Sequence, residues 1–174
     1  ENFDQQAFLA GVTDRFGTKE RRISEQPGQL ALAAISNKQQ EAQQAKSVET
    51  QRAGAEFLAE NGQREGVVTT ASGLQYEVLV AGDGAKPTET DTVSTHYHGT
   101  LIDGTVFDSS VNRGTPASFP VNRVISGWTE ALQLMPVGSK WRLYIPPDLA
   151  YGPRATGKIP ANSTLIFDVE LLAI

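Results

Sequence analysis

The pattern of apolar and polar positions divides the chain into a helical first third and a strand-rich remainder. Residues 1–66 are rich in Ala, Gln and Glu and contain a single proline, Pro27. Residues 67–174 contain eight of the nine prolines, both tryptophans, all four tyrosines and both histidines. The first composition favours helix, and the second favours strands and turns. We therefore predict an all-helical region over residues 1–66 and a separate domain over residues 67–174.

A short helix is predicted over residues 3–16, because the large apolar residues there fall on one helical face. The apolar residues that this region leaves without an obvious cover are Phe3, Phe8, Val12, Phe16, Leu30 and Ile35. A helix pair of this size cannot bury such a face by itself. We therefore predict a homodimer formed through the N-terminal helices, most simply with two-fold symmetry.

A long helix is predicted over residues 28–61, where Gly54 is the only interior helix breaker. Its middle is polar, since Val48 is the only large apolar residue between Ser36 and Glu56. A helix that is polar all round usually bridges two bodies through solvent. We interpret this segment as a spacer helix, with a disordered linker as the alternative.

The second region alternates apolar and polar positions, which is typical of half-buried strands. The strand-like segments are residues 74–80, 93–101, 105–108, 117–121, 141–145 and 164–172. Turn residues separate them, such as Asp103-Gly104, a common hairpin dipeptide. This order predicts an α+β fold in which about five antiparallel strands surround one short helix.

The short helix lies between Val124 and Pro136. We expect Ser126 to be its N-cap and Pro136 to end it. Its apolar stripe at i, i+3, i+4 and i+7 consists of Trp128, Ala131, Leu132 and Met135. A helix of two or three turns is unstable alone, so we expect a sheet to wrap it.

Composition and charge exclude several classes of function. The formal net charge of −5 and the pI near 5.0 argue against a nucleic-acid partner. The absence of cysteine excludes disulfides and thiol chemistry. No apolar run approaches the roughly 20 residues of a membrane span. We expect a cytoplasmic protein, with the periplasm or cell envelope as the alternative, because a chain that begins at Glu1 leaves a removed leader open.

The candidate functional residues are two histidines and a set of aromatic side chains. His96 and His98 share one face of a predicted strand, but no Cys, Asp or Glu on that face completes a metal site. We read them as histidines on a solvated face and expect no metal ion or cofactor. The aromatic set is Tyr97, Phe107, Phe119, Trp128, Tyr151 and Phe167. By spacing alone, these residues are core.

Seven separate segments occur in the order found in the FKBP family of peptidyl-prolyl cis/trans isomerases, which residues 70–174 closely resemble. These segments are His96-Tyr97-His98-Gly99, Asp103-Gly104-x-x-Phe107-Asp108-Ser109-Ser110, Val124-Ile125-x-Gly127-Trp128, Met135-Pro136-Val137-Gly138, Leu149-Ala150-Tyr151-Gly152, Ile159-Pro160 and residues 164–171. The first 66 residues resemble the helical dimerisation extension of the Mip-like bacterial branch. The resemblance implies an antiparallel half-barrel sheet wrapped around the short helix, with a pocket between them.

The resemblance also implies which residues form the site. Asp108, Tyr151 and Tyr97 are expected to be catalytic, with the Tyr151 hydroxyl donating to a bound peptide. The residues expected to bind substrate or a macrolide inhibitor of the rapamycin type are Phe107, Arg113, Phe119, Val124, Ile125, Trp128, Ile159 and Phe167. Two departures from the family pattern bear on the pocket edge. Ala117 replaces an often aromatic residue, and Lys158 stands where an apolar residue is common.

We therefore predict a peptidyl-prolyl cis/trans isomerase that assists protein folding by rotating X–Pro bonds of polypeptide clients in an aromatic pocket. No bond breaks in this reaction, so no nucleophile, metal or acid/base pair is required. The alternative is a non-catalytic module that binds proline-containing segments as a chaperone.

Overall fold

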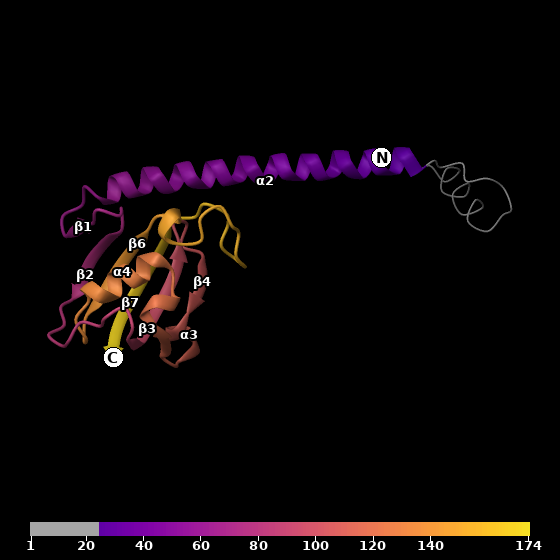
Figure 1. The fold of residues 1–174 in the computed structure, drawn as a ribbon. Helices are drawn as coiled ribbons and strands as arrows, with labels where there is room; N and C mark the ends of the chain where they lie inside the picture. The colour runs from indigo at the N-terminus through magenta and orange to yellow at the C-terminus, as the bar shows by residue number, and fades with distance from the viewer. Residues whose placement is uncertain (1–24) are drawn as a thin grey trace. The chain divides into compact units, whose positions relative to one another are not determined.

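The computed structural model describes residues 25–174 (Figure 1). The chain falls into two compact units, Glu1–Ala45 and Lys46–Ile174. The helix predicted over residues 3–16 lies outside the described residues. The larger unit contains the end of the long helix, the whole sheet and the short helix that the apolar stripe predicted.

The long helix α2 spans Glu25–Asn61 without interruption, so the segment is a helix and not a disordered linker. Its side chains between residues 33 and 46 are exposed, as the polar pattern predicted. The described residues contain no helix that combines the length and the apolar character needed to cross a bilayer.

The sheet of the larger unit has seven strands, all paired antiparallel. The strands are β1 (Val67–Thr69), β2 (Gln75–Val80), β3 (Thr92–Leu101), β4 (Val106–Ser109), β5 (Ala117–Pro120), β6 (Lys140–Ile145) and β7 (Leu165–Ala173). Their order is β1-β2-β6-β7-β3-β4, and β5 also pairs with β3. The α+β fold with an antiparallel sheet around a short helix is thereby confirmed.

The short helix α4 (Ser126–Leu134) lies across one face of the sheet (Figure 1). The predicted stripe is confirmed, because Trp128, Ala131, Leu132 and Met135 are all buried. Alternate residues of β3 and β7 are buried opposite this stripe. Since side chains alternate between the two faces of a strand, every second residue of each central strand faces α4 and forms the core.

The predicted N-cap of α4 is wrong. Ile125 occupies the cap position, and its carbonyl oxygen accepts hydrogen bonds from the amides of Trp128 at 2.9 Å and Thr129 at 3.1 Å. Ser126 is therefore already helical, and the helix begins without a side-chain cap. The helix ends one residue before Met135, and Pro136 follows, as expected.

Four short elements were not predicted. They are β1, the one-turn helix α3 (Ser110–Arg113) and the 3-10 turns η1 (Val121–Arg123) and η2 (Pro147–Leu149). The side chain of Ser109 caps α3 by accepting a hydrogen bond from the Asn112 amide at 3.2 Å. Gly114 ends α3 with a φ of 72°, a conformation that glycine adopts readily.

The C-terminal part of α2 packs on the sheet within the larger unit. Gly54 is buried there, and a Cβ atom added to it would lie 2.4 Å from Thr164 Oγ1. The amide of Asn162 donates to Ser47 Oγ at 2.8 Å, and that of Gln75 donates to the Leu58 carbonyl at 2.8 Å. The one glycine inside the predicted helix therefore permits this close approach.

We expect Gly54→Ala to lower the free energy of unfolding by about 1 kcal/mol, although alanine is the better helix former. Overpacking costs about 1–3 kcal/mol, and the gain in helix propensity is only about 1 kcal/mol. Thr164 is buried and stiff at χ1, so it cannot simply swing away. Urea unfolding measures the difference.

The matched control is the same substitution in a Thr164→Ala background, which removes the Oγ1 atom. There Gly54→Ala should be neutral or stabilising. A Gly54→Ala variant that is more stable than the parent protein would show that the helix does not pack this closely.

Candidate active site

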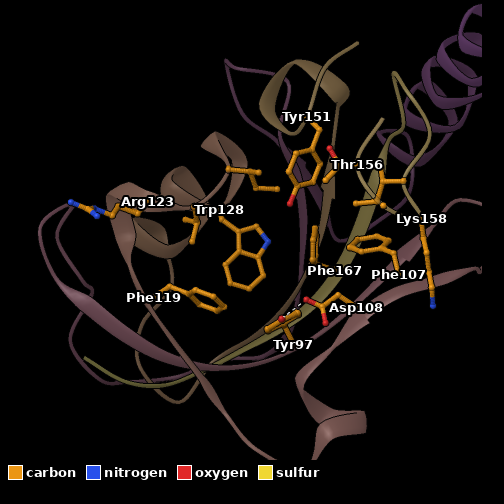
Figure 2. Close-up of a pocket in the computed structure, with 14 residues that line it drawn as sticks. Tyr97, Phe107, Asp108, Phe119, Arg123, Trp128, Tyr151, Thr156, Lys158 and Phe167 are labelled. Atoms are coloured by element: carbon orange, nitrogen blue, oxygen red, sulfur yellow. Dashed lines mark hydrogen bonds between the residues drawn. The ribbon is translucent and has the colours of Figure 1, made fainter. Parts of the chain in front are cut away.

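A pocket of about 590 Å³ opens between α4 and the sheet (Figure 2). Its lining residues come from β3, β4, β5, β7, α4 and the loops beside them. They are Tyr97, Phe107, Asp108, Phe119, Arg123, Val124, Ile125, Trp128, Tyr151, Thr156, Gly157, Lys158, Ile159 and Phe167. Most of this surface is aromatic or aliphatic, which suits an apolar ring as ligand.

Trp128 forms the floor of the pocket and is only 4% exposed. Its indole ring packs edge-on against Tyr97 and Phe167, with ring centroids 5.4 Å and 5.3 Å away. Phe119 adds a third edge contact at 5.8 Å. Edge-to-face pairs at these distances are favourable beyond the area they bury, so the floor is held rigidly by three strands.

Gly99 makes room for the aromatic wall beside this floor. A Cβ atom at Gly99 would lie 2.7 Å from the Phe107 ring and 2.8 Å from the Phe167 ring. The two rings contact each other edge-on at 5.3 Å. The glycine of the His96-Tyr97-His98-Gly99 segment is therefore required by the packing of the wall.

The one carboxylate of the pocket, Asp108, is held by two donors. The Tyr97 hydroxyl donates to Asp108 Oδ2 at 2.5 Å, and Arg113 pairs with Oδ1. Arg113 also donates to the Tyr97 oxygen at 2.8 Å, and its guanidinium lies 5.6 Å from the centre of the Tyr97 ring. The α3 turn places Arg113 for these contacts, and so orients Asp108.

This network shifts the pKa values of its members. Burial raises the pKa of Asp108, but the hydrogen bonds from Tyr97 and Arg113 outweigh it, so the pKa lies below its ordinary value. Burial, followed by the bond to Asp108, raises the pKa of the Tyr97 hydroxyl. At neutral pH, Asp108 is thus an ionised carboxylate and Tyr97 a neutral donor.

The structure brings together all but one of the residues that the resemblance indicated. Arg113 does not line the pocket and instead reaches it through Asp108 and Tyr97. Tyr151 is 39% exposed, and its hydroxyl points towards Trp128 (Figure 2). The roles assigned to these residues stay predictions, because geometry alone does not test them.

Three lining residues had no signal in the sequence, namely Arg123, Thr156 and Gly157. They lie in a 3-10 turn and a loop, where no periodicity predicts which way a side chain faces. In the sequence, Lys158 differs from its neighbours only as a departure from the family pattern. Ala117, by contrast, was expected to affect the pocket edge but lies outside the lining and packs against the core.

The two histidines lie outside this pocket. His96 Nδ1 is 3.1 Å from Ser110 Oγ, and His98 Nδ1 is 2.9 Å from Ser109 Oγ. Both are half-buried and lie on the less buried face of β3, which alternates with the core-facing residues. Within residues 25–174, no group of three or more His, Asp or Glu side chains is arranged to hold a metal ion.

Comparison with known proteins identifies the family. Residues 83–172 match the model of FKBP-type peptidyl-prolyl cis-trans isomerases, and residues 1–78 match the domain amino-terminal to such isomerases. The chain therefore belongs to the FKBP-type peptidyl-prolyl cis-trans isomerase family. The two matches together also support the predicted Mip-like branch, in which a helical region precedes the isomerase domain.

Two curated relatives and one solved structure are similar along much of the chain. An FkpA isomerase of Aeromonas hydrophila is 54% identical over 98% of this chain, which spans 65% of that protein. The outer membrane protein MIP of Legionella longbeachae is 54% identical over 74% of this chain and 56% of its own length. The crystal structure of FkpA from Escherichia coli is 41% identical with a TM-score of 0.83, covering 99% of this chain and 82% of that one.

We expect Arg113→Gln to raise the pKa of the Asp108 carboxyl towards its ordinary value, because one of its two donors is lost. Carbon-13 NMR titration of the aspartate carboxyl groups measures this pKa directly. Arg123→Gln is the control, since Arg123 lines the same pocket without bonding to Asp108. An Asp108 pKa that responds equally to both substitutions would contradict the proposed geometry.

Proposed function

We propose that this protein catalyses the cis/trans isomerisation of X–Pro bonds in polypeptide clients and so assists their folding. The observation that carries the proposal is the aromatic pocket, which combines an apolar floor with a single ionised carboxylate. Membership of the isomerase family agrees with it. The chain spans 65% of the length of the A. hydrophila relative, so the activity of the whole protein is part of this proposal.

The proposed mechanism needs no covalent step. Rotation of an X–Pro amide has a barrier of about 18–20 kcal/mol because resonance keeps the amide planar. Removing water from the amide weakens its charge-separated planar form. A pocket that binds the twisted amide more tightly than the planar one therefore lowers the barrier.

We assign the roles of the pocket residues within this mechanism as follows. Trp128 supports the proline ring from below, and the rings of Phe107, Phe119 and Phe167 exclude water. The Tyr151 hydroxyl and the Ile125 amide donate hydrogen bonds to the bound peptide. Asp108, oriented by Tyr97, places negative charge beside the rotating amide. The same apolar lining would accommodate a macrolide inhibitor of the rapamycin type.

We expect Asp108→Leu to lower kcat/KM for a Phe-Pro peptide about tenfold or more, since interactions with a charged group are worth about 1.5–3 kcal/mol. Tyr151→Phe should cost about two- to tenfold, the value of one neutral hydrogen bond. A protease-coupled assay measures both, and circular dichroism checks that the variants fold. Asp83→Leu is the matched control, because Asp83 is exposed and outside the pocket.

The same assay separates the enzyme from the alternative function. If the parent protein binds proline-containing peptides but does not accelerate their isomerisation, then it is a binding module and not a catalyst. Full activity in Asp108→Leu would agree with a catalytic function but would contradict the role proposed for the carboxylate.

We further propose that residues 1–66 form a dimerisation and spacer region, and that residues 67–174 form the isomerase domain. The match of residues 1–78 to a domain that precedes such isomerases supports this division. Two catalytic domains in one dimer would hold a client at two points, which raises its effective affinity. A chaperone function would follow from this binding of a client at two points.

We expect light scattering at tens of micromolar to give the mass of a dimer. Ile35, 55% exposed on α2, belongs to the apolar set that predicted the dimer, so Ile35→Asp should shift the mass towards a monomer. Val48→Asp is the matched control, because Val48 is equally exposed on the same helix but outside that set. A strict monomer for the parent protein would refute the dimer.

We also propose a location in the cell envelope. The cytoplasmic location that we expected has no support among the relatives. One relative at 54% identity is named an outer membrane protein, which favours the alternative stated above.

A further inference from the structure

Cationic side chains line the pocket of an acidic protein. The formal net charge of the chain is −5, yet the charged residues of the lining are Arg123, Lys158 and Asp108. Asp108 is already paired with Arg113, which lies just outside the lining. A peptide that enters the pocket therefore meets an excess of positive charge, against the sign of the whole molecule.

Neither Arg123 nor Lys158 forms an ion pair with another residue of the described part of the chain. Both side chains are exposed. Figure 2 shows them on opposite sides of Trp128, with the aromatic floor between them. An extended peptide with its proline over Trp128 would run out of the pocket past one cation or the other.

The Lys158 side of the pocket is the more strongly cationic. Glu89 and Glu130 line a neighbouring hollow that shares Val124 with the pocket, so acidic side chains lie near the Arg123 side. The loop from Tyr151 to Lys158 contains Arg154 and Lys158 and no acidic residue. Lys158 should therefore contribute more than Arg123 to the recognition of charge.

The backbone holds Lys158 at the rim of the pocket. Thr156 and Ile159 exchange two hydrogen bonds, each 2.9 Å long, and close a tight turn that has Gly157 and Lys158 at its centre. Gly157 adopts a φ of 56°, which favours glycine. Ile159 is buried in the core and anchors the end of the turn. The turn therefore fixes the backbone of Lys158 at the rim, within reach of the pocket that it lines.

We propose that the site prefers X–Pro bonds that have an acidic residue close to the proline, and that Lys158 is the main residue that determines this specificity. This inference rests on the proposed isomerase function of the same pocket. An exposed ion pair is a weak interaction, and salt screens it. The preference should therefore be about threefold at low ionic strength and should fade as salt is added.

The test compares short peptides that share one Phe-Pro bond and differ at a single position near it, Glu in one and Gln in the other. One pair has the variable residue on the N-terminal side of the Phe-Pro unit, and a second pair has it on the C-terminal side. NMR exchange measures the catalysed rate without a coupling protease, whose own charge preference would interfere. We expect at least one Glu peptide to have a kcat/KM about threefold above that of its Gln partner, with the ratio approaching one at high salt.

The ratio of kcat/KM between the Glu peptide and its Gln partner is then measured in three variants. It should fall strongly in Lys158→Gln, fall less in Arg123→Gln and persist in Lys86→Gln, the control, because Lys86 is exposed and outside the lining. Equal rates for Glu and Gln peptides in the parent protein would overturn the inference, as would a ratio that survives Lys158→Gln. Absence of catalysis with every peptide would instead refute the isomerase function.

Discussion

The edge-on packing of Trp128 against rings from three strands is the contact on which the rest of the larger unit depends. Tyr97 comes from β3, Phe119 from β5 and Phe167 from β7, and each lies within 6 Å of the indole centre. The same contact fixes a helix too short to be stable alone and forms the floor of the pocket. The same residues therefore belong to the hydrophobic core and to the floor of the pocket.

A floor made of core residues suits a reaction that depends on the exclusion of water and has no covalent step. The aromatic rings supply an apolar surface whose members already pack against one another in the absence of a peptide. Asp108, the one carboxylate of the pocket lining, is kept in place by Tyr97 and Arg113. Since Arg113 sits on the one-turn helix α3, this small element orients the carboxylate of the pocket.

Much of the fold could be predicted from the sequence, because apolar periodicity reports burial in regular elements. The strands β2 to β7 and the stripe of α4 have enough residues to show their period. β1 and α3 have only three and four residues, too few for any period, and the cap of α4 depends on backbone geometry that Ser126 does not reveal.

The site was accessible only through the family resemblance, because Tyr97, Asp108 and Trp128 come from three different elements that only the fold unites. Nothing in the spacing of these residues distinguishes a pocket floor from ordinary core. The direction in which the side chains of Arg123 and Lys158 point depends on loop conformation. No periodic pattern in the sequence predicts that conformation.

The central claim is that the pocket accelerates rotation without transferring a proton, and the pH dependence of kcat/KM tests it most directly. Asp108 keeps its charge because its pKa is lowered, and neither histidine lines the pocket. NMR exchange with a neutral Phe-Pro peptide should therefore give a nearly constant kcat/KM between about pH 6 and 8. A bell-shaped profile with a midpoint near the ordinary histidine pKa of about 6.5 would contradict the account.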